Sequence, residues 1–353
     1  MRLDFERMID PLLKWYQKEK RELPWRKDKD PYHIWVSEIM LQQTRVEAVK
    51  GYYARFLQEL PDIASLAACP EEKLLKLWEG LGYYNRVRNM KKAAVSMMED
   101  YGGLFPSSYE EILGLSGIGS YTAGAIASIA FSLPYPAVDG NVLRILMRVA
   151  DDPSDISKAE VKKRVEKALK EHMPSDPGSW NQALMELGAL VCLPNGEPHC
   201  QSCPWNEICL AKKKGTISRR PVKSPKKARR KEERAVLIIS DGEKVLLHKR
   251  PKKGLLAGLY EFPNLEGKKS REELLEYAQK MGEHILRIQE LEEAKHIFTH
   301  VEWHMKGYLL RIEEAHERLE KDYFYANLDE LEKVYAIPSA FRLYTDFAKK
   351  WIE

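Results

Sequence analysis

Apolar residues recur at helical spacing through the first part of the chain and at strand spacing in the last third. Segments 71–77 and 161–171, for example, place apolar residues every three or four positions between charged ones. Proline and glycine punctuate these segments, and β-rich runs are scarce among them. From residue 1 to about 211, the pattern therefore predicts an all-α domain.

The pattern changes after residue 234. Residues 235–240 and 244–249 are short β-rich runs, and Asp241-Gly242 between them is a hairpin signal. A helical stretch near 270–281 follows, and then strand-like segments at 294–300 and 305–312. Residues 235–353 are therefore predicted to form a mixed α/β domain.

Between the two patterns lies a basic segment, residues 212–234. It carries twelve Lys and Arg residues against Glu232 and Glu233, and Pro221 and Pro225 interrupt it. Almost nothing in it could fill a core, so the pattern predicts a solvated, extended linker between the domains. A linker that also contacts phosphates is the sharper interpretation, and the segment alone leaves it open.

Length and charge suit a two-domain protein of ordinary composition. The chain has 353 residues, and 57 basic residues nearly cancel 53 acidic ones, which leaves a net charge of +4. No apolar run approaches the roughly 20 residues that a membrane helix needs, and the first ten residues carry no signal-peptide pattern. We therefore expect a soluble, cytoplasmic protein without a membrane partner.

Four of the five cysteines fall within one short stretch. Cys192, Cys200, Cys203 and Cys209 have the spacing C-x7-C-x2-C-x5-C, whereas Cys69 stands alone. Four thiolates at such spacing can ligate a [4Fe–4S] cluster or a zinc ion, and spacing alone does not decide between them. In a reducing compartment, metal ligation is the stronger interpretation over disulfides.

A glycine-rich turn lies between two helical patterns at residues 113–124. Leu115, Gly117 and Gly119 form an L-x-G-x-G segment that predicts a tight hairpin. The helix beginning near Ser120 would add its N-terminal dipole, and such a helix–hairpin–helix can hold a DNA phosphate. By itself, the segment is also consistent with a plain turn.

Two acidic residues lie in segments where a charge needs an explanation. Asp139, between Val138 and Gly140, either caps the helix that follows or projects a carboxylate into a cleft. Glu38 lies in an apolar helical run, where an unpaired carboxylate is costly, so it either faces solvent or is a functional acid.

Taken together, these segments resemble the MutY-type adenine DNA glycosylases of the helix–hairpin–helix superfamily. The resemblance runs in the family's order through nearly the whole chain. Its segments are LPWR (23–26), WVSEIMLQQT (35–44), GLGYYNRVRN (80–89), LSGIGSYTAGAI (115–126), AVDGNV (137–142), NQALMELGALVC (181–192), GLLAGLYEFP (254–263) and HIFTHVEW (296–303).

The resemblance implies a base-excision repair enzyme that flips adenine out of a pair with 8-oxoguanine, or with guanine, and cleaves its N-glycosidic bond. Its fold would be an all-α glycosylase domain with an iron–sulfur cluster loop over residues 1–211, a linker over 212–234, and a Nudix-like α/β domain over 235–353. The cofactor would be a [4Fe–4S] cluster on the four clustered cysteines. The resemblance places Trp25, Arg26, Leu41 and Gln182 around the flipped adenine, Gln43 and Tyr83 in the base stack, Phe298, Thr299 and His300 at 8-oxoguanine, and Gly117 and Gly119 at a DNA phosphate.

The resemblance also divides the chemistry between two carboxyl groups. Glu38 matches the general acid that protonates adenine N7, which requires a pKa raised toward neutrality by burial. Asp139 matches the ionised partner that stabilises the cationic sugar or captures it covalently. Tyr121 and Asn141 match residues that orient water and these carboxyl groups.

The same resemblance bears on activities that should be lacking. Endonuclease III-like relatives carry a Schiff-base lysine where this chain has Tyr121, so we expect little or no AP lyase activity. Hydrolytic Nudix enzymes need acidic residues on a helix that here has Ala278, Gln279 and Lys280, so nucleotide hydrolysis is not expected. The chain departs from the family at Thr299, where Ser is usual, and in its first cysteine gap, which is seven residues rather than six.

Two other functions were weighed against this one. One is a helix–hairpin–helix glycosylase acting on another mispair, such as thymine opposite guanine, against which Arg26 and Gln182 argue. The other is a non-catalytic lesion-binding protein, against which the presence of both Glu38 and Asp139 argues. The expected partner is double-stranded DNA with an A:8-oxoguanine mispair, bound by a monomer in the cytoplasm, at the nucleoid if the protein is bacterial. A clamp or repair protein is a further candidate at the basic linker.

Overall fold

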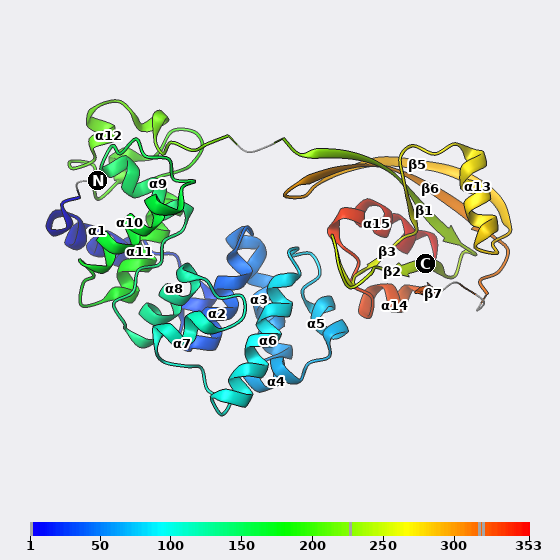
Figure 1. Cartoon of the computed structure of the whole chain (residues 1–353), viewed down its shortest axis with the longest axis horizontal. Coiled ribbons are helices and arrows are strands. Elements are labelled where there is room, and N and C mark those ends of the chain that lie inside the picture. The colour runs from blue at the N-terminus through cyan, green and yellow to red at the C-terminus, as the bar shows by residue number, and fades with distance from the viewer. Residues whose placement is uncertain (1–2, 226–227, 317–318, 320–321) are drawn as a thin grey trace. The chain divides into compact units, whose positions relative to one another are not determined.

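A computed structural model describes residues 3–225, 228–316, 319 and 322–353 of the chain (Figure 1). By internal contacts, the chain divides into two compact units, which we describe separately. Unit 1 comprises residues 1–68 and 88–225, and unit 2 comprises residues 69–87 and 226–353. Among the described residues, no helix combines the length and apolar composition that crossing a lipid bilayer requires.

Unit 1 is helical, as the sequence predicts. Its helices are α1 (Phe5–Glu19), α2 (Pro31–Leu41), α3 (Val46–Glu59), α4 (Ile63–Ala68), most of α6 (Asn85–Asp100), α7 (Tyr109–Gly114), α8 (Ser120–Phe131), α9 (Gly140–Val149), α10 (Ala159–Lys170), α11 (Pro177–Leu190) and α12 (Leu210–Lys213). Short 3₁₀ turns lie at Pro24–Arg26, Cys200–Ser202 and Ile217–Arg219.

Helices α2 and α8 are buried along almost their whole length. Every residue from Ile34 to Met40 in α2 and from Thr122 to Ser128 in α8 is buried. Small residues in α8 permit close approach of its neighbours. A Cβ on Gly124 would lie 2.2 Å from the carbonyl oxygen of Pro136, so only glycine fits there. A second core, around α1, α9, α10 and α11, encloses Trp180 and Trp205.

Unit 2 contains a curled sheet. Its strands are β1 (Arg230–Ser240), β2 (Val245–Lys249), β3 (Tyr260–Glu261), β4 (Asn264–Glu266), β5 (Ile285–Ile297), β6 (Val301–Ile312) and β7 (Tyr323–Ala326). The main order is β3-β2-β1-β6-β5, in which β1 and β6 are parallel and the other neighbours antiparallel; β4 and β7 pair with β1 and β2. Helices α5 (Glu71–Leu77), α13 (Arg271–Lys280), α14 (Leu328–Lys333) and α15 (Arg342–Trp351) complete the unit, with a 3₁₀ turn at Ser339–Phe341.

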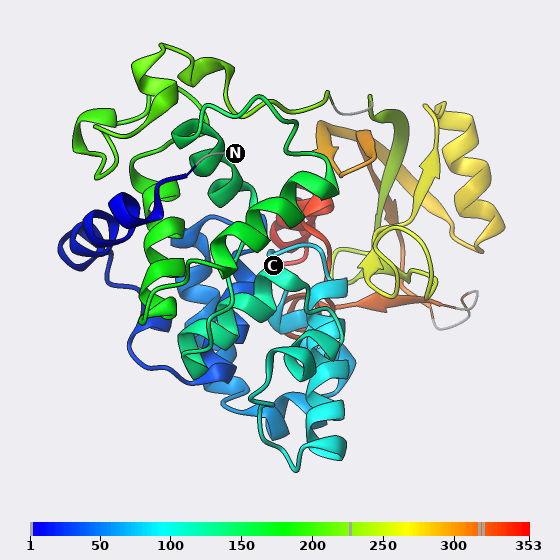
Figure 2. The same ribbon diagram turned by 60° about the vertical axis from the view of Figure 1, so that its left-hand side comes forward.

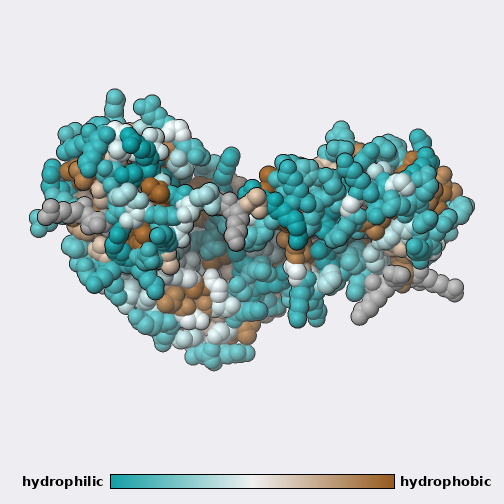
Figure 3. All heavy atoms as spheres, turned by 45° about the horizontal axis from the view of Figure 1, so that its top comes forward, coloured by the Kyte–Doolittle hydropathy of each residue, from teal (hydrophilic) through white to brown (hydrophobic). Residues whose placement is uncertain are grey.

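Alternating side chains of β1 face two separate cores. Val236 and Ile238 pack with α15, whereas Leu237 and Ile239 pack with α13. The two helices cover opposite faces of the long strands (Figures 1 and 2). On the face of the molecule drawn in Figure 3, the surface is mostly hydrophilic and hydrophobic atoms form small, scattered groups.

The basic segment 212–234 differs from the solvated, extended linker that its composition predicts. Residues 212–225 belong to unit 1: Arg220 pairs with Asp151 at 3.0 Å, and the Ile156 amide donates to the Val222 carbonyl at 3.0 Å. Residues 230–234 already belong to β1. The segment is therefore bound at both ends, because its backbone and basic side chains find partners that are distant in the sequence.

Two strand limits also differ from the sequence expectation. The strand expected from residue 294 begins at Ile285, and residues 298–300, expected at its end, form the turn that joins β5 to β6. Register shifts in the β5–β6 pairing, between Ile285 and Arg287 and between Glu290 and Glu293, break the alternation of apolar and polar residues in β5. The strand is therefore hard to recognise from its pattern.

Candidate active site

Helix α2 carries Glu38 into the interior of unit 1. The helix begins after Asp30, whose carboxylate accepts a hydrogen bond from the Tyr32 amide at 2.8 Å. Glu38 is only 6% exposed, and this burial raises its pKa to about 7. A hydrogen bond from Tyr121 opposes the rise, the charge of Asp139 adds to it, and the charge of Arg26 opposes it. Glu38 can therefore hold or release a proton near neutral pH.

Tyr121, in the first turn of α8, lies beside this carboxyl group. Its hydroxyl is 3.7 Å from the sulfur of Met185 and interacts with Glu38. Burial raises the pKa of Tyr121 well above its ordinary value, and the nearby carboxylates of Glu38 and Asp139 raise it further. Tyr121 is therefore a neutral hydrogen-bond donor at physiological pH.

Asp139 is the N-cap of α9 and is half-buried. Its Oδ1 accepts hydrogen bonds from the amides of Asn141 and Val142, both at 2.8 Å, and its Oδ2 accepts one from the Asn141 side chain at 2.7 Å. The capping interpretation is therefore confirmed. The capping carboxylate can also belong to the site, because its charge reaches Glu38 and raises the pKa of that residue. Three donors hold it in one orientation.

The structure thus brings together all four residues that the resemblance assigns to catalysis. Glu38, Tyr121 and Asp139 act on one another electrostatically, and Asn141 contacts Asp139 directly. Their individual roles stay predictions.

Arg144 connects Asn141 to the segment that bears the first clustered cysteine. Its guanidinium donates to Asn141 Oδ1 at 2.8 Å, to the Gly188 carbonyl at 2.9 Å and to the Cys192 carbonyl at 2.9 Å. The sequence analysis did not identify Arg144. A charged residue inside the apolar run of α9 was the signal that could have identified it.

Glu186, on α11, is a second residue that the sequence analysis missed. It is fully buried, and its carboxylate accepts hydrogen bonds from Arg21 at 2.7 Å and from Arg26 at 2.8 Å. Burial alone would raise the pKa of Glu186, but these bonds lower it to about 2. Arg26, predicted to lie near the flipped adenine, is thus held in place by a buried carboxylate.

The other residues predicted around the base are less constrained. Trp25 is buried and packs edge-on against Tyr53 at 5.4 Å between ring centroids. Leu41 and Gln182 are half-buried, and among the described residues the Gln182 side chain makes one hydrogen bond, a long one of 3.4 Å to the Gly178 carbonyl. The amide of Gln182 is therefore free to reorient.

Both residues predicted to enter the base stack have left-handed backbone conformations. Gln43 in unit 1 has φ 58° and Tyr83 in unit 2 has φ 49°, and both are exposed. Such conformations are costly for residues with a Cβ and cluster at functional sites. The turn that carries Tyr83 is held by Arg86, which donates to the carbonyls of Leu81 and Gly82 at 2.9 and 3.1 Å.

The glycine hairpin before α8 forms as predicted, but its two glycines differ. Gly117 has φ +78°, and a Cβ there would lie 2.6 Å from the Cβ of Asn89. Gly119 has φ −101° and no atom within 4 Å of a Cβ position, so its backbone conformation and surroundings do not require glycine. Gly119 instead leaves the N-terminus of α8 open to close approach.

The four clustered cysteines line one cavity in unit 1, together with Arg148, Trp205 and Ile217 among others. Arg148 donates to the Cys192 sulfur at 3.3 Å. Burial raises the pKa of Cys203 to about 12 and also raises the pKa values of Cys200 and Cys209. All four thiols line this one cavity, which fits their predicted role as ligands of a single group, although among the described residues they are not drawn together into a group arranged to hold a metal ion.

In unit 2, the residues predicted to contact 8-oxoguanine form the turn between β5 and β6. Thr299 and His300 are exposed, whereas Phe298 is half-buried and packs edge-on against Trp303 at 4.9 Å. Ala278, Gln279 and Lys280, which the resemblance sets against the acids of hydrolytic Nudix enzymes, lie at the end of helix α13. Among the described residues, no group of three or more His, Cys, Asp or Glu side chains is arranged to hold a metal ion.

Two family models match the chain. Residues 36–171 match the HhH-GPD superfamily of base excision DNA repair proteins, and residues 234–346 match the NUDIX domain. Solved structures support the helical part. A thermostable thymine-DNA glycosylase aligns over 60% of this chain and 97% of its own, with 26% identity and a TM-score of 0.53. Endonuclease III in a non-covalent DNA complex aligns over 61% and 99%, with 25% identity and a TM-score of 0.51.

The fold and the site thus define a base-excision repair protein of the helix–hairpin–helix superfamily with an added Nudix domain. Curated relatives refine this class. The adenine DNA glycosylase of Mus musculus is 36% identical over 86% of this chain and 70% of its own length, and that of Homo sapiens is 36% identical over 86% and 66%. The enzyme of Buchnera aphidicola subsp. Baizongia pistaciae is 36% identical over 82% of each chain. The chain belongs to the adenine DNA glycosylase family.

Proposed function

We propose that this chain removes adenine paired with 8-oxoguanine, and also adenine paired with guanine, from double-stranded DNA. The observation that carries the proposal is the placement of Glu38. A buried carboxyl group with a pKa of about 7 lies in electrostatic contact with Asp139. A proton donor beside an anion is the arrangement needed to break a glycosidic bond through a cationic sugar.

Each residue then has a definite task. Glu38, in its protonated form, gives its proton to N7 of the flipped adenine, so that the base departs as a neutral molecule. Tyr121 donates a hydrogen bond to Glu38 and keeps its carboxyl group in place. Asp139, oriented by Asn141 and the first turn of α9, faces the cationic sugar and stabilises it.

The absence of an amine at position 121 supports a glycosylase without strand cleavage. A phenol cannot form a Schiff base with the sugar aldehyde, so we propose little or no AP lyase activity. Borohydride treatment should therefore trap no more adduct than with the Tyr121→Phe variant. Trapping at a level typical of a lyase would overturn this part of the proposal.

We propose that Cys192, Cys200, Cys203 and Cys209 hold a [4Fe–4S] cluster, which would cross-link residues 192–209, the segment that follows α11. Support comes from the shared cavity and from Arg148, whose charge would offset that of ligated thiolates. Purified protein should contain iron and sulfide and absorb broadly in the visible range. One equivalent of zinc without iron would contradict the assignment.

For partners, we propose a monomer bound to duplex DNA in the cytoplasm, at the nucleoid in a bacterium. Exposed Lys223, Arg229 and Lys231 leave room for a clamp or repair protein at the basic segment. A pull-down with the segment's lysines changed to glutamine, compared with the unchanged chain, tests that partner.

A single-turnover excision assay on matched duplexes tests the substrate. The duplexes carry A:8-oxoG, A:G, A:C or T:G at one position and are otherwise identical. We expect release of adenine to be fastest from A:8-oxoG, slower from A:G, and no release of thymine from T:G. Fastest release from T:G would replace the proposal with a thymine glycosylase, and binding without release would indicate a lesion-binding protein.

A further inference from the structure

The turn that joins β5 to β6 has little structure of its own. Its backbone is closed by a hydrogen bond from the Phe298 amide to the Val301 carbonyl, at 2.8 Å. Thr299 and His300 are exposed, whereas Phe298 is half-buried and packs against Trp303. The positions of Thr299 and His300 therefore depend on what holds Phe298.

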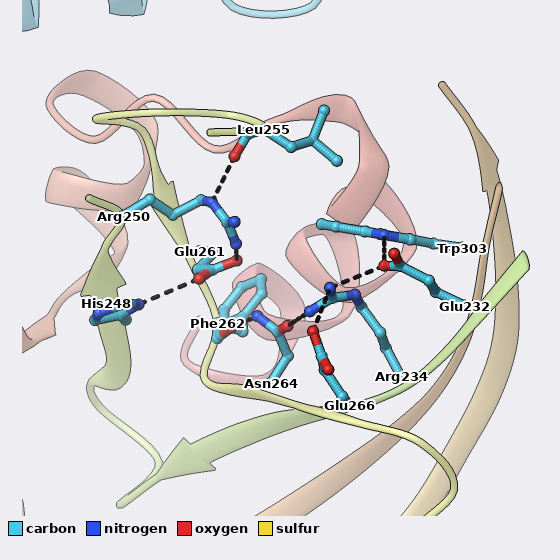
Figure 4. A network of polar contacts seen from close by, with 10 residues as sticks. All are labelled: Glu232, Arg234, His248, Arg250, Leu255, Glu261, Phe262, Asn264, Glu266 and Trp303. Atoms are coloured by element: carbon cyan, nitrogen blue, oxygen red, sulfur yellow. Dashed lines mark hydrogen bonds and ion pairs between the residues drawn. The ribbon is translucent and has the colours of Figure 1, made fainter. Parts of the chain in front are cut away.

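Beneath Phe298 lies a tryptophan that is held on two sides. Trp303 is 1% exposed, and its Nε1 donates to Glu232 Oε2 at 2.9 Å. The guanidinium of Arg234 lies 4.2 Å from the ring centroid of Trp303 and donates to the same Glu232 oxygen at 3.0 Å. Figure 4 shows Glu232, Arg234 and Trp303 joined in this way, with Asn264 accepting a further bond from Arg234 at 2.9 Å.

The strand pairing keeps this cluster in register with the turn. Glu232 lies opposite Trp303 in the parallel pairing of β1 with β6. Just before β1, the Arg229 side chain donates to the Phe298 carbonyl at 3.1 Å, and the Arg230 amide donates to the His300 carbonyl at 3.1 Å. The start of β1 and the residue before it thus hold the backbone of the turn through hydrogen bonds to the Phe298 and His300 carbonyls.

We propose that Glu232, Arg234 and Trp303 are positioning residues that set the Phe298–His300 turn and thereby its selectivity for 8-oxoguanine over guanine. This inference rests on the proposed function and on the contact with 8-oxoguanine that the family resemblance assigns to the turn. The two bases differ at the edge that such a turn can read, because 8-oxoguanine has an N7–H donor where guanine has an N7 acceptor. A hydroxyl such as that of Thr299 distinguishes them only if its position is fixed to within a few tenths of an ångström.

The test compares the ratio of excision rates, A:8-oxoG over A:G, in full-length variants. Arg234→Gln removes both the stacked cation and the charged bond to Glu232, and we expect the ratio to fall about fivefold, as for the loss of one well-placed hydrogen bond. Arg234→Lys keeps a cation near the indole and should restore part of the ratio. An unchanged ratio in Arg234→Gln would overturn the inference.

Arg250 provides a matched control in the same domain. Its side chain is 18% exposed, against 12% for Arg234, and it pairs with buried Glu261 at 2.5 Å and donates to the Leu255 carbonyl at 3.0 Å (Figure 4). Among the described residues, its side chain bonds Leu255 and Glu261 and makes no hydrogen bond with Glu232 or Trp303. We expect Arg250→Gln to leave the ratio unchanged. An equal loss in Arg250→Gln would show that general destabilisation of the domain explains the effect, and would refute positioning.

Thr299→Val separates failure of this inference from failure of the proposed function. If Thr299→Val keeps the ratio, the turn does not read 8-oxoguanine through Thr299 and the positioning role fails, whereas the proposed function fails only if the unchanged chain does not release adenine from A:8-oxoG. If the ratio of excision rates falls in Thr299→Val but not in Arg234→Gln, only the positioning role fails. In the double variant Arg234→Gln/Thr299→Val, we expect no loss beyond that of Thr299→Val, because Arg234 acts through the turn; additive losses would contradict this.

Discussion

The titration of Glu38 predicts how excision depends on pH. Burial raises the pKa of Glu38 from 4.5 to about 7, and the reaction needs the protonated form. With a pKa of about 7, about 90% of Glu38 is protonated at pH 6 and about 10% at pH 8. The single-turnover rate on A:8-oxoG should therefore fall about tenfold between these two pH values.

Tyr121 and Asp139 shift the pKa of Glu38 in opposite directions, so replacing each one predicts a measurable shift of known direction. Tyr121 lowers the pKa of Glu38 through its hydrogen bond, so Tyr121→Phe should move the fall in rate to higher pH. Asp139 raises it, so Asp139→Asn should lower the pKa of Glu38. For that variant, the titration must be followed by carbon-13 NMR of labelled glutamate, because Asp139 is itself predicted to be catalytic.

The same shift predicts the stability of the protein. Between pH 4.5 and 7, the folded chain retains the Glu38 proton, whereas the unfolded chain has released it. Stability therefore falls across this window by about 3 kcal/mol, the equivalent of a pKa change from 4.5 to about 7. Glu38→Gln should lack this fall when denaturant unfolding of the two proteins is compared at each pH. A wild-type excision rate that stays flat from pH 6 to 8.5, with no difference in unfolding, would refute the reasoning.

Three further substitutions test the packing that supports the site. Glu186→Gln leaves two arginines without their buried partner and should cost about 3–5 kcal/mol of unfolding free energy near pH 7. Because the pKa of Glu186 is about 2, the wild type should lose this extra stability only as the pH falls from 4.5 toward 2. A Glu186→Gln protein as stable as the wild type at pH 7 would contradict the ion-pair account. Gly124→Ala places a methyl group 2.2 Å from the Pro136 oxygen and should lower the melting temperature, whereas Gly51→Ala on α3, with no atom within 4 Å, should leave it unchanged or raise it. Equal melting temperatures for the two alanine variants would contradict the close packing of α8.

Local patterns predicted the elements that local forces determine. The helix at Glu71–Leu77 and the hairpin at Asp241-Gly242 follow from periodicity and turn chemistry, and both form. The family resemblance identified Glu38, Tyr121, Asp139 and Asn141, and the structure brings them together. The apolar helix left open whether Glu38 faces solvent or is a functional acid, and the structure shows that it is buried.

Features that depend on distant partners were not predictable in this way. Glu186 meets Arg21 across 165 positions of sequence, so no window of the chain reveals the pair. The basic segment from 212 is bound through Asp151 and the backbone of Ile156, whose positions only the fold supplies. Strand β5 escaped recognition because shifts in its pairing break the two-residue period.

The central claim is that Glu38 supplies the proton that releases adenine. Its most direct test is chromatographic measurement of free adenine from an A:8-oxoG duplex at pH 7, in single turnover, with the wild type, Glu38→Gln and the exposed-site control Glu99→Gln. We predict release by the wild type and by Glu99→Gln, and none by Glu38→Gln although it still binds the duplex. Release by Glu38→Gln at the wild-type rate would contradict the account.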